Sequence, residues 1–360
     1  MGTRRRPAPA IDPVPELGLR PLPRPWGRPL LQVASPMPLI GHIAFGVIDR
    51  GTNVLQVRPT TLCPLSCIFC SVDAGPESRT RQAEYIVEPG WLASWVEEAA
   101  REKGVPVEAL IDGVGEPLTY PHIVELVRLL KSSGVVRSVA AETHGATLTR
   151  RLVDRLEEAG LDRINLSIDT LDPEKARRLT GTPWYDVERV KKLAEYIARE
   201  TSIDLHVTPV WLPGVNDRDV VEVVDWAYRI GAGKRWPPAT VQKYVAHRRG
   251  RKPRGVREPT WEEYWRWLRR IEEQTGRRLT WAMEEWGMRP APRLRNPLPR
   301  GTRVTLQVAG PGWQRGELLA VAPRQRRVVT LLSAPWARPG QLVPAKITHD
   351  KDGILIARPA

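Results

Sequence analysis

Between residues 53 and 244, short strand-like runs alternate with amphipathic helical runs, and this alternation restricts the possible folds more than any other feature of the chain. The predicted strands are Asn53–Val57, Ala109–Ile111, Ser138–Ala141, Arg163–Ile168, Ile203–Val210 and Thr240–Tyr244. The predicted helices are Pro89–Lys103, Pro121–Ser132, Thr149–Ala159, Asp186–Glu200 and Asp217–Ile230. Repeated strand–helix units are typical of a parallel sheet with crossover helices. Polar or glycine-rich loops follow several strands directly, which is where parallel barrels keep their active sites.

The segment before this alternation has a different composition. Residues 1–38 are rich in Pro and Arg, and such a composition cannot build a core by itself. We therefore predict that residues 1–38 form an extended or disordered arm. The α/β core is predicted to span residues 39–245 and to begin with a hairpin whose first strand is His42–Ile48.

Two further segments follow the core. Residues 246–300 contain a basic loop, a Trp-rich helix at Trp261–Gln274 and a Pro-rich linker. The large apolar residues at helical spacing, which we expect to face the core, are Trp261, Trp265, Leu268 and Ile271. Residues 301–360 show no helical pattern, and their five short strands predict a small antiparallel, OB-like β-barrel. Those strands are Arg303–Val308, Glu317–Val321, Arg327–Leu332, Leu342–Ile347 and Gly353–Ile356.

The net charge of +14 is unevenly distributed along the chain. Residues 31–240 are mildly acidic, whereas residues 241–300 carry 16 basic and 7 acidic groups and residues 301–360 carry 9 and 3. This segregation favours a polyanionic partner bound by the basic segments; the alternative is an Arg-rich composition of the kind found in heat-adapted proteins. No run of 18 apolar residues and no secretory signal is present, so no membrane association and a cytoplasmic location are expected.

All three cysteines of the chain lie within eight residues, in the loop after the predicted strand Asn53–Val57. Cys63, Cys67 and Cys70 form a C-x3-C-x2-C motif. Their odd number and close spacing argue against a disulfide framework. Three thiolates can hold three irons of a four-iron cluster and leave the fourth iron open to a ligand. A structural zinc site is the alternative, but it needs a fourth ligand, and neither His42 nor His122 stands at a suitable spacing.

The cysteine motif resembles that of the radical S-adenosylmethionine (SAM) superfamily. In that family the open iron binds the amino and carboxylate groups of SAM, and reductive cleavage yields a 5′-deoxyadenosyl radical that abstracts a hydrogen atom. Phe69 matches the aromatic residue before the last cysteine, near which the backbone contacts adenine. The resemblance covers roughly residues 50–245. It implies a partial, TIM-like (β/α)6 barrel, one 4Fe–4S cluster, SAM as cofactor, and an electron donor such as a ferredoxin or flavodoxin.

Further segments match the family in order. Gly113, Gly115 and Glu116 stand at the family's Gly-Gly-Glu-Pro segment, which contacts the amino group of the cofactor. Thr143 and Ser167 resemble ribose contacts of the molybdopterin-synthesis branch, although either hydroxyl is also suited to a local cap or turn bond. That branch carries a second, C-terminal cysteine set for another cluster. This chain has no such set, which argues against the substrate of that branch.

The tail resembles a TRAM domain, an OB-like barrel of RNA-modifying enzymes, most closely at 339–347. Trp313 and Trp336 are candidates either for stacking on bases or for its core. A basic stretch without any acid follows the last core strand, so we expect it near the mouth of the active site. Its members, which we predict to bind RNA, are Lys243, Arg248, Arg249, Arg251, Lys252, Arg254 and Arg257. A merely solvated loop is the alternative.

A radical SAM core followed by a TRAM-like tail resembles an archaeal group of Fe–S oxidoreductase-like proteins. We therefore expect a radical enzyme that modifies tRNA or rRNA. The alternative is an enzyme acting on a small metabolite or a peptide, in which the tail serves structure or a protein partner.

Overall fold

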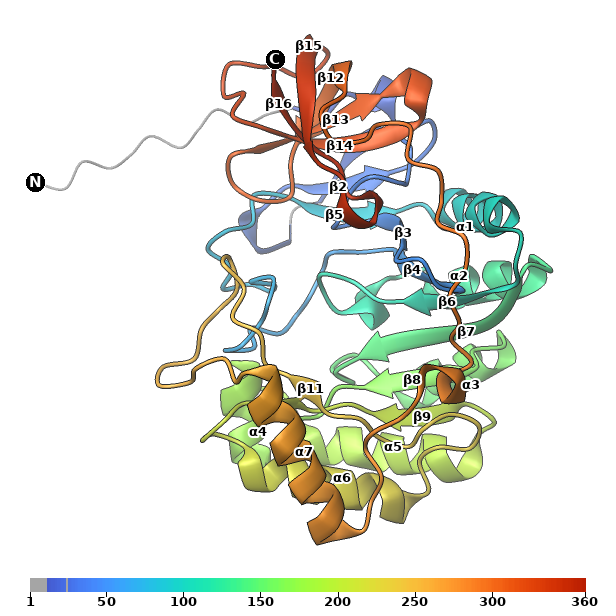
Figure 1. Cartoon of the computed structure of the whole chain (residues 1–360), viewed down its shortest axis with the longest axis vertical. Helices are drawn as coiled ribbons and strands as arrows, with labels where there is room; N and C mark the ends of the chain where they lie inside the picture. The colour runs from blue at the N-terminus through green and yellow to red at the C-terminus, as the bar shows by residue number, and fades with distance from the viewer. Residues whose placement is uncertain (1–11, 24) are drawn as a thin grey trace, which may run out of the picture.

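A computed structural model describes residues 12–23 and 25–360 of the chain. Its centre is a six-stranded sheet of order β3-β4-β6-β7-β8-β9, in which β3 is antiparallel to β4 and all other neighbours are parallel (Figure 1). The strands are β3 (Gly46–Asp49), β4 (Val54–Arg58), β6 (Val107–Ile111), β7 (Val136–Thr143), β8 (Arg163–Leu166) and β9 (Asp204–Val207). A parallel bridge from Val207 to Ala239 continues the sheet toward the short pair β10 (Val210–Trp211) and β11 (Gln242–Lys243).

Crossover helices connect the parallel strands, as the alternation predicts. They are α1 (Pro89–Lys103), α2 (Ile123–Ser132), α3 (Arg150–Glu158), α4 (Pro173–Thr180), α5 (Val187–Glu200) and α6 (Asp217–Ile230), and α7 (Trp261–Thr275) follows β11. Side-chain caps begin several of them: Thr149 accepts from Leu152 N, and Asp186 accepts from Arg189 N. The predicted fold class, a partial (β/α)6 barrel followed by a small β-barrel, is confirmed. Among the described residues, no helix is both long and apolar enough to span a bilayer.

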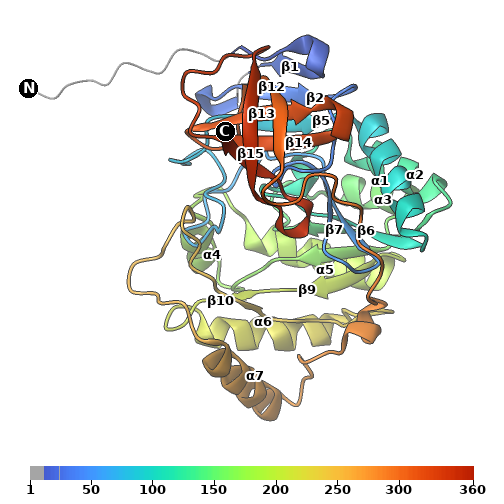
Figure 2. The same cartoon turned by 45° about the horizontal axis from the view of Figure 1, so that its top comes forward.

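The described part of the 1–38 arm is folded. Strand β1 (Leu19–Leu22) pairs antiparallel with β2 (Leu30–Val33), and β2 pairs parallel with β5 (Glu84–Val87). Leu19 and Val33 are fully buried in the main hydrophobic core, so this segment packs against apolar side chains from other parts of the chain. Figure 2 shows this sheet beside the C-terminal barrel. The rest of the predicted arm, residues 1–11 and 24, lies outside the described residues.

The C-terminal barrel is closed, with strand order β12-β13-β14-β16-β15. The strands are β12 (Arg303–Pro311), β13 (Glu317–Ala322), β14 (Arg327–Leu332), β15 (Leu342–His349) and β16 (Ile356–Pro359). Two details of the prediction were wrong. The β14–β16 pair is parallel, so the barrel is not purely antiparallel. Strand β16 also begins later than predicted, because residues 351–353 form a turn in which Asp352 has a φ of 55°.

The linker from α7 to the barrel packs along the amino ends of the parallel strands. Asn53, directly before β4, donates to Gly287 O at 3.0 Å and accepts from Arg289 N at 2.7 Å. Lys103 forms a buried ion pair with Asp49 at 2.7 Å and also donates to the Pro292 carbonyl. The linker therefore covers one end of the sheet and leaves the carboxyl ends of the strands for the site.

Candidate active site

A cavity of about 380 Å³ lies at the carboxyl ends of β4, β6, β7 and β8. Every residue predicted to hold the cluster or to contact SAM lines it: Cys63, Cys67, Phe69, Cys70, Gly113, Gly115, Glu116, Thr143 and Ser167. These residues come from four separate loops. Parallel strands place the loops that follow them at one edge of the sheet, which explains why distant motifs converge here.

The cysteine loop, residues 63–79, is held by backbone hydrogen bonds to the end of α4. Ser66 N donates to Thr180 O at 3.0 Å, and Ile68 N donates to Leu179 O at 2.9 Å. The Ala74 N–H points at the Cys70 sulfur, 3.2 Å away. Burial, followed by the charge of Glu116, raises the pKa of the Cys63 thiol, and burial together with the neighbouring cysteines raises that of Cys67. A nearby metal charge is what would hold these thiols deprotonated.

These residues fit a four-iron cluster. Three thiols border the cavity, and a chain with no other cysteine leaves one iron of such a cluster open. Within the described residues, no three or more His, Cys, Asp or Glu side chains converge to ligate a single metal ion. A four-iron cluster needs no such convergence, because each thiolate binds a different iron. Cys63, Cys67 and Cys70 would hold the cluster, which when bound supplies the electron for cleavage of SAM.

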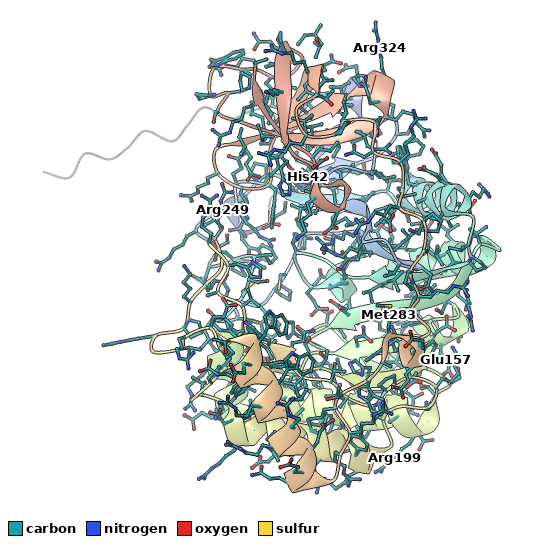
Figure 3. The ribbon with its side chains drawn as sticks, viewed as in Figure 1. His42, Glu157, Arg199, Arg249, Met283 and Arg324 are labelled. Atoms are coloured by element: carbon teal, nitrogen blue, oxygen red, sulfur yellow. The ribbon has the colours of Figure 1, made fainter. Side chains whose placement is uncertain are left out.

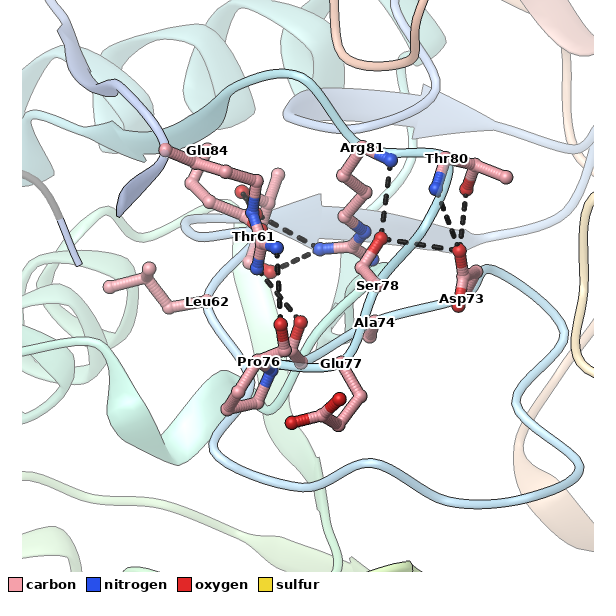
Figure 4. Close-up of polar contacts among 12 residues, drawn as sticks. Thr61, Leu62, Asp73, Ala74, Pro76, Glu77, Ser78, Thr80, Arg81 and Glu84 are labelled. Carbon is pink, nitrogen blue, oxygen red and sulfur yellow. Dashed lines mark hydrogen bonds and ion pairs between the residues drawn. The ribbon is translucent and has the colours of Figure 1, made fainter. Parts of the chain in front are cut away.

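Asp73 accepts several hydrogen bonds from residues at the end of the cysteine loop (Figure 4). Its Oδ2 accepts from Thr80 N at 2.9 Å, from the Thr80 hydroxyl at 2.8 Å and from Arg79 N at 2.8 Å, and Ser78 donates to the same oxygen. Burial alone would raise the pKa of Asp73, but these hydrogen bonds and the charge of Arg251 lower it below its ordinary value. An ionised Asp73 therefore fixes the return of the chain toward β5.

The glycine segment makes a close backbone contact with the residues that lead to Cys63. A Cβ on Gly115 would lie 2.4 Å from Leu62 O and 2.5 Å from Thr61 O, so no side chain fits there. Glu116 is fully buried and accepts from the Thr143 hydroxyl at 2.6 Å and from His144 N at 2.8 Å. The carboxylate thus joins the ends of β6 and β7.

The two predicted ribose contacts differ in their hydrogen bonding. The Thr143 hydroxyl donates to Glu116 and accepts from Gly145 N at 2.8 Å, so its hydrogen is used within the protein. The Ser167 hydroxyl has no partner in the described part of the chain, and Ser167 borders the cavity. Thr143 therefore orients Glu116, and Ser167 is the better placed of the two to bind a ligand hydroxyl.

Sequence reasoning missed several residues that line the same cavity: Glu142, His144, Gln242, Tyr244 and His247. His144 Nδ1 lies 3.2 Å from the Ser167 carbonyl, which can only accept, so Nδ1 carries a proton in this contact. Burial, and then the charge of Asp112, raise the pKa of Glu142 to about 7. Glu142 and His144 could have been proposed from the sequence by their position alone, because they flank Thr143 at the end of a predicted strand.

The raised pKa of Glu142 predicts that the contribution of this residue to the free energy of unfolding falls as the pH rises. A carboxyl whose pKa is higher in the folded chain contributes stability that is fully present below its unfolded pKa of 4.5 and is lost as pH rises through about 7. We expect wild type to lose stability relative to Glu142→Gln between pH 4.5 and 7. Urea unfolding midpoints of both proteins across this range measure the difference; a constant or growing advantage of wild type would contradict the assignment.

The seven residues of the basic stretch differ in whether they form ion pairs within the protein. Lys243 lines the cavity and pairs with Glu258 at 2.7 Å, and Arg257 pairs with Glu263. Two members, Arg249 and Arg251, bond to the C-terminal barrel and to the cysteine loop respectively. The remaining three, which are exposed and have no ion-pair partner among the described residues, are Arg248, Lys252 and Arg254. Four of the seven are thus in intramolecular ion pairs, and RNA binding by the stretch stays a prediction.

The prediction that Trp261 and Trp265 face the core was wrong. Their side chains are 61% and 41% exposed, whereas Leu268 and Ile271 are buried as predicted. The third buried residue of α7 is Tyr264, whose hydroxyl donates to Val241 O at 2.6 Å. The tail tryptophans also differ, since Trp313 is buried and Trp336 is exposed.

Comparison with known proteins places this site in a family. Residues 57–227 match the model of the radical SAM superfamily. An uncharacterized protein of Methanocaldococcus jannaschii is 33% identical over 354 residues, which cover 92% of this chain and 80% of that protein. GTP 3′,8-cyclase of Chlorobaculum tepidum is 32% identical over 176 residues, which cover 49% of this chain and 50% of the cyclase.

Among solved structures, Streptococcus suis SuiB bound to S-adenosylmethionine aligns with 64% of this chain and 51% of its own, with 21% identity and a TM-score of 0.48. Family membership is shown by the sequence relatives, and the matched residues 57–227 contain the cysteines and the glycine segment that line the cavity. This chain belongs to the radical SAM superfamily, whose members cleave SAM to generate a 5′-deoxyadenosyl radical.

Proposed function

We propose that this enzyme modifies a nucleotide of tRNA or rRNA by radical chemistry. One electron from a ferredoxin or flavodoxin and one SAM give methionine and the 5′-deoxyadenosyl radical, which takes a hydrogen atom from the nucleotide to give 5′-deoxyadenosine. A single cluster is assigned, since the three cysteines are the only ones in the chain.

The observation that carries the RNA assignment is the position of the exposed cations. Val245 and His247 line the cavity, and Arg248, Lys252 and Arg254 follow them directly on the same loop. None of these three cations forms an ion pair in the described part of the chain. A polyanion bound to them would lie across the mouth of the cavity, which is where a target nucleotide has to enter.

A second charged surface, on the C-terminal barrel, supports the same assignment. Arg303 on β12 lies opposite Lys346 on β15, and Lys346 lies opposite Arg358 on β16. All three are exposed, and none has an ion-pair partner within the described residues. Like charges directly opposite one another on neighbouring strands repel. A phosphate backbone on this face relieves that repulsion, in keeping with the resemblance to a TRAM domain.

The assignment predicts the effect of neutralising the loop cations. In the variant Arg248→Gln/Lys252→Gln/Arg254→Gln we expect weaker tRNA binding and a slope of log K against log salt reduced in magnitude by about 2 to 3, at 0.7 to 0.9 per lost phosphate contact. Fluorescence anisotropy with labelled tRNA at several salt concentrations measures both quantities.

The matched control neutralises three exposed arginines on α2 and α3, Arg128→Gln/Arg151→Gln/Arg155→Gln, which removes the same charge elsewhere on the core. The control is expected to change the slope little. Equal slopes for wild type and the loop variant would contradict the proposal that RNA binds to this loop. Absence of any salt-sensitive binding by wild type would instead favour a small metabolite or a peptide as substrate.

A further inference from the structure

The loop after β11 contacts the cysteine loop through Arg251, whose side chain is only 18% exposed. Its Nε donates to Asp73 Oδ1 at 2.9 Å and its Nη1 donates to Cys67 O at 2.8 Å. Its Nη2 donates to Ala74 O, and its backbone N donates to Cys70 O at 2.8 Å. One residue, 178 positions from Asp73 in the sequence, therefore bonds to the cysteine loop four times.

The residue before Arg251 lies equally close to the cysteine loop. A Cβ on Gly250 would lie 2.8 Å from Ser71 O and 3.0 Å from Cys70 O, so the two backbones touch with no room for a side chain. This contact brings Arg251 into reach of the Cys67 and Ala74 carbonyls. A loop that served only to display charge to solvent would not need such an approach.

Arg249 connects the same loop to the C-terminal barrel (Figure 3). Its guanidinium pairs with Glu317 on β13 at 2.7 Å and bonds to the Gln314 amide oxygen. The barrel in turn contacts the chain just after the cysteine loop, through Arg315 N to Thr80 O at 2.8 Å. Residues 249–251 therefore lie between the barrel and the cysteine loop and bond to both.

We propose that Arg251 is a positioning residue for the iron–sulfur cluster: it holds the cysteine loop in its binding conformation and raises the reduction potential of the cluster. The planar guanidinium satisfies two carbonyls and a carboxylate at once, which a lysine cannot reproduce. Net charge and nearby hydrogen bonds set cluster potentials. Arg251 bonds to the Cys67 carbonyl and compensates the charge of Asp73, so its loss would leave an unpaired carboxylate next to the cysteine loop and disfavour the reduced form, which carries one more negative charge. This inference rests on family membership and is independent of the RNA assignment.

The first test uses the protein without its cluster. We expect Arg251→Gln to speed amide hydrogen exchange across residues 66–80, with no change in the strands of the core, and Arg254→Gln to leave exchange in both regions unchanged. Arg254 is the matched control, because it is an exposed cation of the same loop. Equal exchange at 66–80 in Arg251→Gln and wild type would overturn the positioning role.

The second test uses the reconstituted protein and follows the cluster itself. A redox titration monitored by electron paramagnetic resonance is expected to show a lower midpoint potential for Arg251→Gln, a smaller downward shift for Arg251→Lys, and the wild-type value for Arg254→Gln. An unchanged midpoint in Arg251→Gln would refute the claim about potential. If Arg251→Gln binds too little iron to titrate, Arg251→Lys and the exchange measurement decide the matter.

Discussion

Replacing Cys67 by alanine is expected to remove the cluster and to abolish SAM cleavage while leaving the fold in place. Cys67 is buried at the cavity, and the chain has no fourth cysteine that could take its place. Two remaining thiols leave two irons without protein ligands. Iron analysis and the yield of 5′-deoxyadenosine under reducing, anaerobic conditions measure the effect, and both are expected to fall to background.

The control for this loss is Ser94→Ala, because Ser94 is exposed on α1 and does not line the cavity. It is expected to keep wild-type iron and cleavage. Circular dichroism separates loss of the cluster from loss of the fold, since helices such as α1, α3 and α5 take their caps from residues outside the cysteine loop. Wild-type iron content and cleavage in Cys67→Ala would contradict the assignment of the cluster ligands.

Replacing Glu84 by glutamine is expected to lower the free energy of unfolding by about 3–5 kcal/mol, the usual effect of leaving one partner of a buried ion pair alone. Glu84 and Arg81 are both fully buried and lie 3.0 Å apart (Figure 4). Glu84 also pairs with Arg28 at 3.2 Å and accepts from the Thr61 hydroxyl at 2.6 Å. Without the carboxylate, the Arg81 guanidinium is a buried charge with no counterion.

The matched control is Glu98→Gln. Glu98 pairs with Arg326 on the surface, where the two side chains are 48% and 55% exposed. Exposed pairs contribute about 0–1 kcal/mol, so this variant is expected to unfold close to wild type. Urea denaturation of both variants gives the comparison, and similar losses in the two would show that the buried network does not stabilise the fold as argued.

The core elements were predictable from sequence because their signals are local. Helices α1 and α6 have the predicted bounds, since helical periodicity and the residues at their ends lie within each segment itself. Strands β1 and β2 were not predictable in the same way. They sit in a proline-rich stretch, and β2 gains its partner, β5, only about fifty residues later in the chain.

The site shows the same division between local and distant information. Cys63, Gly115 and Ser167 were found because short motifs mark the ends of the strands that position them. The partners of Arg249 and Arg251 could not be found, because a run of arginines reads as a solvated or RNA-binding surface unless the distant acceptors are known. Those acceptors, Glu317 and Asp73, are brought to the loop only by tertiary packing.

The most direct test of the account is the yield of 5′-deoxyadenosine from the reconstituted, reduced enzyme and SAM, measured with and without unmodified tRNA or rRNA. We expect 5′-deoxyadenosine to form and one of these RNAs to increase its yield. A yield that neither RNA changes would contradict the proposed substrate, and no 5′-deoxyadenosine under any condition would contradict the radical chemistry on which the account depends.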